Sequence, residues 1–126
     1  MKTGNIYVIT HKPLASSLPE HYRKLYVGAA KLPQEEKQKL TGYGFDDEGH
    51  NISNKNGSYC ELTGLYWIWK NQQADIVGIS HYRRFFTEEG ETLAWERAER
   101  VIYKCMFCIR KVKNICLQGR GISYWK

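Results

Sequence analysis

The sequence predicts an α/β domain with a parallel sheet, and this prediction depends on two short apolar runs with a helix between them. Residues 5–10 and 76–80 are rich in β-branched side chains and carry no charge, which is typical of strands buried in a parallel sheet. Between them, residues 58–71 are aromatic and have helix signals at both ends. The order strand, helix, strand indicates an α/β fold.

The first predicted strand ends in Thr10, His11 and Lys12, followed by a proline. Ligands of open α/β sheets bind at the carboxyl ends of strands, so these three residues are candidates for binding an anionic group. Solvated loop residues would give the same pattern. The sequence leaves both interpretations open.

Three segments after the first strand have weaker signals. Residues 19–30 carry apolar residues at helix-like spacing, but a proline and a glycine leave the type of element open. Residues 32–40 are strongly charged and predict a short exposed helix. Residues 42–49 have the composition of a loop.

An acidic triplet, Asp46, Asp47 and Glu48, lies in this predicted loop. Hard divalent cations prefer several carboxylate oxygens, so the triplet could hold a cation. The alternative interpretation is a solvated acidic turn.

Residues 50–56 are rich in asparagine. Asparagine side chains both donate and accept hydrogen bonds, which suits either tying a loop to its own backbone or recognising sugar hydroxyls and a base edge. Asn51, Ser53 and Asn56 are therefore candidates for substrate binding as well as for folding of the loop.

Ser58 and Glu61 have the spacing of a capping box, which predicts that a helix begins at this point. Large apolar side chains share one face of this helix, namely Tyr59, Leu62, Tyr66 and Trp69. Because Trp67 and Ile68 lie on other faces, we expect the helix to be buried nearly all round. Glu61 is interpreted either as a capping residue or as a carboxylate that acts in catalysis or binds a sugar.

The second predicted strand is followed by His81, Tyr82, Arg83 and Arg84. If the strand continues, His81 and Arg83 point to one face and Tyr82 and Arg84 to the other. Two arginines at the carboxyl end of a strand can each bind phosphate oxygens through two hydrogen bonds. In the alternative, one arginine pairs with a glutamate a few residues downstream and the other is solvated.

Composition divides the chain near residue 102. Residues 1–100 hold 13 basic and 13 acidic side chains, whereas residues 101–126 hold six basic ones and no acidic one. Residues 91–102 predict a helix, and three of the four cysteines follow it. We therefore expect a domain over residues 1–102 and an atypical basic tail over residues 103–126, foreign to the fold.

The tail suggests binding to nucleic acid or to an anionic membrane, and a zinc site is less favoured. Its aromatic and basic residues could bind nucleic acid, although the neutral body argues against such a partner, or they could contact an anionic membrane. Its C-x-x-C motif lacks the second cysteine pair that structural zinc sites usually have. The chain has neither an apolar run of about 18 residues for a membrane span nor a signal peptide, so we expect a cytoplasmic location.

The motifs NISNKN, YCELTGLYWIWKN and DIVGISHYRRFF lie between residues 51 and 86. Together they resemble the signature of a bacterial glycosyltransferase domain family of capsular and exopolysaccharide biosynthesis, long catalogued as a domain of unknown function. The run IYVITHKP resembles the opening strand of that family, and the resemblance covers about residues 4–102.

This resemblance implies a Rossmann-like domain of the GT-A type, which binds a nucleotide-diphosphate sugar and transfers the sugar to a saccharide or lipid-linked saccharide. Because members of the family are longer, it also implies an incomplete, amino-terminal portion. A cytoplasmic enzyme at the inner membrane face would fit a lipid-linked acceptor.

The resemblance also implies roles for individual residues. Arg83, Arg84 and Lys12 would face the diphosphate, while polar groups of the sugar or nucleotide would be bound by Asn51, Ser53, Asn56 and His81. Glu61 or Asp47 would be the catalytic base. The HYRR motif stands where GT-A enzymes usually carry a metal-binding D-x-D, so the arginines could neutralise the diphosphate in place of Mn or Mg. A divalent cation is the alternative.

Overall fold

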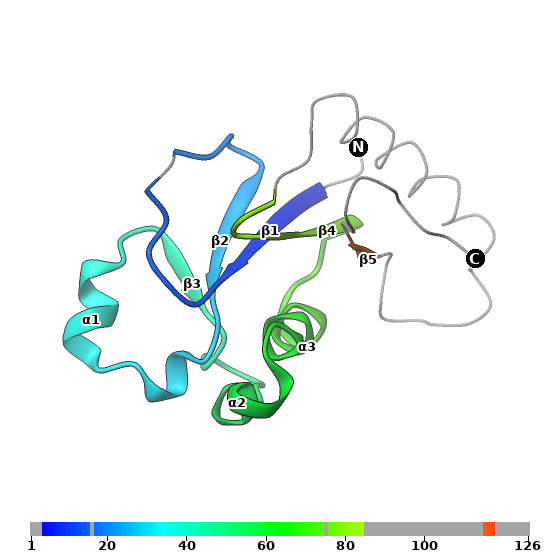
Figure 1. The fold of residues 1–126 in the computed structure, drawn as a ribbon. Coiled ribbons are helices and arrows are strands. Elements are labelled where there is room, and N and C mark those ends of the chain that lie inside the picture. The colour runs from blue at the N-terminus through cyan, green and yellow to red at the C-terminus, as the bar shows by residue number, and fades with distance from the viewer. Residues whose placement is uncertain (1–3, 16, 75, 85–114, 118–126) are drawn as a thin grey trace.

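A parallel sheet of five strands organises the chain, in the order β3-β2-β1-β4-β5 (Figure 1). The computed structural model describes residues 4–15, 17–74, 76–84 and 115–117. The strands are β1 (Gly4–Thr10), β2 (Tyr22–Tyr26), β3 (Tyr43–Phe45), β4 (Ile76–His81) and β5 (Ile115–Leu117). The chain builds outward from β1 to β3 and then returns to the other side of β1 with β4, which is the order of a doubly wound fold.

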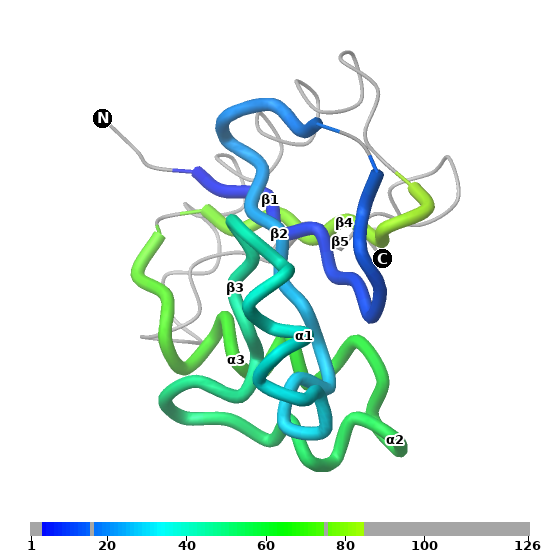
Figure 2. Tube along the Cα trace, turned by 90° about the vertical axis from the view of Figure 1, so that its left-hand side faces the viewer, coloured from blue at the N-terminus to red at the C-terminus, as the bar shows by residue number. Residues whose placement is uncertain are grey.

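The helical elements lie between the strands in sequence. They are η1 (Ala29–Lys31), α1 (Gln34–Lys39), η2 (Ser53–Lys55), α2 (Asn56–Tyr59) and α3 (Leu62–Asn71). Figures 1 and 2 both place α2 outside α3, further from the central strand β1. No helix in the described part of the chain is both long and apolar enough to cross a bilayer.

The two faces of the sheet are covered differently. On one face, Trp67 and Ile68 of α3 pack against Ile9 of β1, Leu25 of β2 and Ile79 of β4. On the other face, the buried side chains of β1 and β2 are covered by Leu14 and Leu18 of the connecting loop and by Tyr82. A helix therefore covers one face, and mainly loop residues cover the described part of the other.

The predicted strands at residues 5–10 and 76–80 and the short helix within residues 32–40 are confirmed. The undetermined segment 19–30 contains strand β2, and the predicted loop 42–49 contains strand β3. Strand β2 is hard to recognise in the sequence because Arg23 and Lys24 are charged. In the structure the cationic end of Lys24 lies 5.1 Å from the ring centroid of Tyr43 on β3. The predicted helix 91–102 and the cysteine motif lie outside the described residues.

The predicted capping box is wrong. Helix α3 begins at Leu62, and Glu61 at its N-cap makes no capping hydrogen bond through its side chain. The chain is broken before this helix by Cys60, whose backbone adopts φ 49° and ψ −127°. Asn56 stabilises the break instead, because its side-chain amide donates to the Cys60 carbonyl and to the Thr63 hydroxyl.

The prediction that α3 is buried nearly all round is also wrong. Its buried residues are Thr63, Gly64, Trp67 and Ile68. Large side chains of the opposite face are exposed, with Leu62 at 51% and Trp69 at 40%. The inward face is marked by a glycine instead: a Cβ at Gly64 would lie 2.8 Å from Val27 Cγ1, so this small residue lets the helix approach the sheet closely.

Asp46, directly after β3, connects the elements at the carboxyl end of the sheet. Its side chain is fully buried and accepts hydrogen bonds from the amides of Gly28 and Ala29, both at 3.0 Å. It also accepts from the hydroxyls of Ser53, at 2.5 Å, and Thr63, at 2.7 Å. The predicted solvated turn is therefore wrong for Asp46, whose carboxyl group instead ties β2, η2 and α3 to β3.

Replacing Asp46 with asparagine tests this role. Asp46→Asn is expected to lower the free energy of unfolding by about 2 kcal/mol or more, because the amide nitrogen cannot accept and leaves buried donors without a partner. The neighbouring Asp47 pairs with Lys37, and both side chains are partly exposed, at 18% and 19%, so Asp47→Asn is a matched control that should cost less than Asp46→Asn. Urea unfolding curves measure both, and equal losses would contradict the role given to Asp46.

Candidate functional site

The carboxyl ends of β1 and β4 meet at the point where the strand order reverses. The two strands are parallel neighbours, with Ile9 opposite His81. Beyond this pair the Tyr82 amide donates to the Ile9 carbonyl at 3.2 Å, and the Val27 amide donates to the Thr10 carbonyl at 2.9 Å. In open α/β sheets this reversal leaves a crevice in which ligands bind.

Tyr82 is the centre of a cluster of basic side chains at this crevice, which we call the Tyr82 cluster. The His81 ring lies 4.3 Å from the Tyr82 ring centroid, and the His11 ring meets it edge-on at 5.1 Å. Lys12 Nζ lies 5.2 Å and Arg83 Cζ 5.3 Å from the same centroid. Residues from two strand ends that are 70 positions apart in the sequence thus gather around one aromatic ring.

A tight turn, and not a continuing strand, presents the arginines. The Arg84 amide donates to the His81 carbonyl at 2.9 Å, and the Arg83 amide contacts His81 Nδ1 at 3.2 Å. The buried Ser80 hydroxyl donates to the Arg84 carbonyl. The predicted alternation of side chains beyond His81 is therefore wrong, and both arginines are exposed on the turn. The glutamates proposed as their partners lie outside the described residues.

Thr10 supports the loop that carries Lys12. Its hydroxyl donates to the Lys12 carbonyl at 2.6 Å and accepts from the Lys12 amide at 3.2 Å. The Thr10 side chain is itself buried, at 1% exposure, whereas His11 and Lys12 are exposed. The Tyr26 hydroxyl also donates to the His11 carbonyl at 2.8 Å and so fixes the backbone that precedes Lys12.

The charge of Glu61 affects the pKa of His81, a member of the Tyr82 cluster. Burial lowers the pKa of His81 below its ordinary value, and the positive charges of Arg83, Arg84 and His11 lower it further. The carboxylate of Glu61 acts in the opposite direction and raises this pKa. The negative charge of the exposed Glu61 thus partly offsets the lowering of the His81 pKa.

The side chains of the asparagine-rich segment form hydrogen bonds within the loop itself. Asn51 donates to the carbonyls of Asp47 and Gly49 and accepts from the Ser53 amide. The Ser53 side chain is fully buried, donates to Asp46 and accepts from the Ala30 amide. The structure thus favours the loop-folding interpretation of Asn51, Ser53 and Asn56 and leaves Ser53 inaccessible to a substrate.

Asp47, the other predicted base, is placed differently from Glu61. Its carboxylate forms an ion pair with Lys37 of α1, and its second oxygen has no hydrogen-bond partner among the described residues. Those residues include no group of three His, Cys, Asp or Glu side chains arranged to hold a metal ion.

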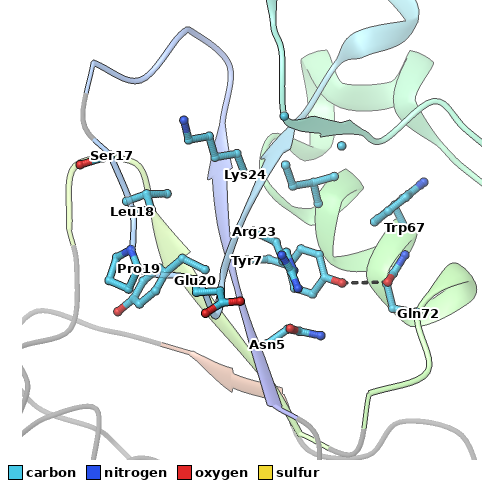
Figure 3. A pocket seen from close by; sticks show the side chains of 14 residues that line it. Asn5, Tyr7, Ser17, Leu18, Pro19, Glu20, Arg23, Lys24, Trp67 and Gln72 are labelled. Atoms are coloured by element: carbon cyan, nitrogen blue, oxygen red, sulfur yellow. Dashed lines mark hydrogen bonds between the residues drawn. The ribbon is translucent and has the colours of Figure 1, made fainter.

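A cavity of about 780 Å³ that the sequence did not indicate lies beside β1 and β2 (Figure 3). It is lined by Asn5 and Tyr7 of β1, by Arg23 of β2, and by Trp67 and Gln72 at α3. The Tyr7 hydroxyl donates to Gln72 Oε1 at 2.8 Å across it. The lining also includes residues 17–20 of the loop before β2, and none of the predicted site residues is among it.

The strand order and the site at its reversal point define a Rossmann-like α/β domain of the GT-A type. The chain belongs to the family described as "Domain of unknown function (DUF4422)", whose model matches residues 5–120. A search of the curated proteins gives no match.

Among solved structures, the chain is similar to the apo structure of WbbM, a bifunctional glycosyltransferase, with 44% sequence identity and a TM-score of 0.56. The similarity covers 64% of this chain and 14% of that one. The chain thus corresponds to a small part of WbbM.

The family match crosses the predicted boundary at residues 102 and 103. Strand β5, which pairs with β4 in parallel, also lies beyond that boundary. The division into a domain and a foreign tail stays a prediction.

The coupling between Glu61 and His81 can be measured. We expect Glu61→Gln to lower the pKa of His81 further, because the opposing negative charge is lost. Glu36→Gln, on the exposed surface of α1, is the matched control and should leave this pKa unchanged. Titration of the histidine ring signals by NMR gives the values. An unchanged His81 pKa in Glu61→Gln would show that the two side chains are not coupled.

Proposed function

We propose that this chain provides the nucleotide-sugar-binding part of a glycosyltransferase of polysaccharide biosynthesis. The enzyme would transfer a sugar from a nucleotide-diphosphate sugar to a saccharide or lipid-linked saccharide. The observation that carries the proposal is the Tyr82 cluster at the strand reversal point, where ligands of this fold class bind. The similarity to part of a bifunctional glycosyltransferase supports it.

The charge of the Tyr82 cluster suits a diphosphate. Lys12, Arg83 and Arg84 are exposed, so their cationic groups are available to a ligand. Arginine can bind two phosphate oxygens at once, and Lys12 adds a compact charge from the neighbouring strand end. When the bond to the sugar breaks, negative charge develops on the departing nucleoside diphosphate, and fixed positive groups stabilise that charge.

The two candidate bases are not equivalent in this proposal. Glu61 is exposed and acts on His81, so it is the better candidate to accept a proton from the acceptor hydroxyl. Asp47 is occupied by Lys37. Thr10, Asn51, Ser53 and Asn56 would then act indirectly, by fixing the loops on which the binding residues lie.

The arginines would also take the place that a divalent cation has in enzymes with a D-x-D motif. Mn or Mg is the competing hypothesis, in which one or two carboxylates would hold the cation together with the phosphates of the ligand. Binding measured in excess chelator separates the two hypotheses.

Thermal unfolding with a panel of nucleotide-diphosphate sugars tests the proposal. A ligand present at a hundred times its Kd stabilises the folded state by about 2.7 kcal/mol, so at least one member should raise Tm, with chelator present. Arg83→Ala and Lys12→Ala should each weaken binding roughly tenfold or more, because each removes a charge-assisted contact to the diphosphate.

Lys39→Ala is the matched control for these variants, since Lys39 is an exposed lysine of α1 that pairs only with Glu36 among the described residues. It should bind as the wild type does. The proposal fails if no nucleotide sugar raises Tm, or if Arg83→Ala and Lys12→Ala bind as tightly as Lys39→Ala. A Tm increase that chelator abolishes and manganese restores would favour the metal hypothesis.

A further inference from the structure

The outward face of α3 carries large apolar side chains that the fold does not bury. Leu62 is 51% exposed and Trp69 40%, and Tyr66 lies between them at helical spacing. Tyr59, in the preceding α2, is 49% exposed. We call these four residues the outer α3 face. On α3, the residues of this face lie on the side opposite Trp67 and Ile68, which pack on the sheet.

Lysines accompany this face. Lys70 Nζ lies 3.8 Å from the ring centroid of Trp69 and 5.7 Å from that of Tyr66. Lys55 is exposed and precedes Tyr59 by four residues in the same helical stretch. Tryptophan and tyrosine favour the boundary between lipid and water, and lysine beside them can reach anionic headgroups with its charged end.

The face extends from the candidate site. Leu62 follows Glu61, whose charge acts on His81, and Trp69 is seven residues further along the helix, or roughly 10 Å. A planar surface lying along α3 would therefore pass close to Glu61, which directly precedes Leu62.

We propose that the outer α3 face binds the surface of an anionic lipid bilayer. A stable protein partner needs about 800 Å² on each side and some 20–30 residues, which exceeds a face of four side chains. A few apolar side chains that enter the headgroup region, together with lysines, are sufficient for weak and reversible membrane binding. The lysines make the anionic surface the fitting partner.

This inference goes beyond the proposed function, because lipid binding requires no nucleotide. It also differs from the membrane contact predicted for the basic tail, since here the contacting residues belong to the folded domain. One consequence rests on the proposed function: a lipid-linked acceptor would be presented close to Glu61.

Sedimentation of the full chain with lipid vesicles tests the inference. We expect binding to vesicles of phosphatidylcholine and phosphatidylglycerol in equal amounts, weaker binding to phosphatidylcholine alone, and weaker binding at high salt. Leu62→Ser and Trp69→Ser should each weaken binding about tenfold, because each removes apolar area from the lipid contact. Lys70→Glu should weaken it several-fold, whereas Lys39→Glu, the same charge change on α1, should have a smaller effect.

Several results would overturn the inference. One is that the wild-type chain binds neither kind of vesicle. Another is that the double variant with Leu62→Ser and Trp69→Ser binds vesicles as the wild type does, while its circular dichroism spectrum shows that it is folded. A loss of binding only on deletion of residues 103–126 would assign lipid binding to the tail. Concentration-dependent self-association that the same variants abolish would assign the face to a second copy of the chain. The nucleotide-sugar Tm measurement is independent of all of these.

Discussion

The buried carboxyl group of Asp46 is the interaction on which the carboxyl end of the sheet depends. A polar group without water must find partners inside the protein, and here the amides of Gly28 and Ala29 and the hydroxyls of Ser53 and Thr63 supply them. These four partners come from three different elements. One side chain therefore fixes the start of η1, η2 and the first turn of α3 relative to β3.

The candidate site follows from this arrangement and from the strand order. With α3 fixed by Asp46 and packed closely through Gly64, Glu61 is positioned where its charge acts on His81. Because β4 returns beside β1, the loop with Lys12 and the turn with Arg83 lie at the same aromatic ring. Their positive charge is available to a ligand because both residues are exposed. The fold thus brings together basic residues that are far apart in the sequence.

Several features could be predicted from the sequence because they depend on local patterns. The strands 5–10 and 76–80 are short apolar runs rich in β-branched residues. When two such strands are parallel, the residues that follow them lie at the same end of the sheet. Other features depend on tertiary packing. The charged Arg23 and Lys24 interrupt the apolar pattern of strand β2, so the sequence does not predict this strand. The burial of Asp46 depends on hydrogen-bond partners up to 18 residues away. The face of α3 that packs on the sheet is the face with Gly64, because a larger side chain there would meet Val27. The distribution of large apolar residues along the helix does not reveal this.

The position of the nucleotide sugar is the most direct test of this account. An NMR titration of the ¹⁵N-labelled chain, with the nucleotide sugar that raises Tm, reports on each backbone amide. The largest shift changes are expected at residues 11–12 and 82–84, around the Tyr82 cluster. Changes centred on Asn5, Arg23 and Gln72, which line the separate cavity of Figure 3, would contradict it.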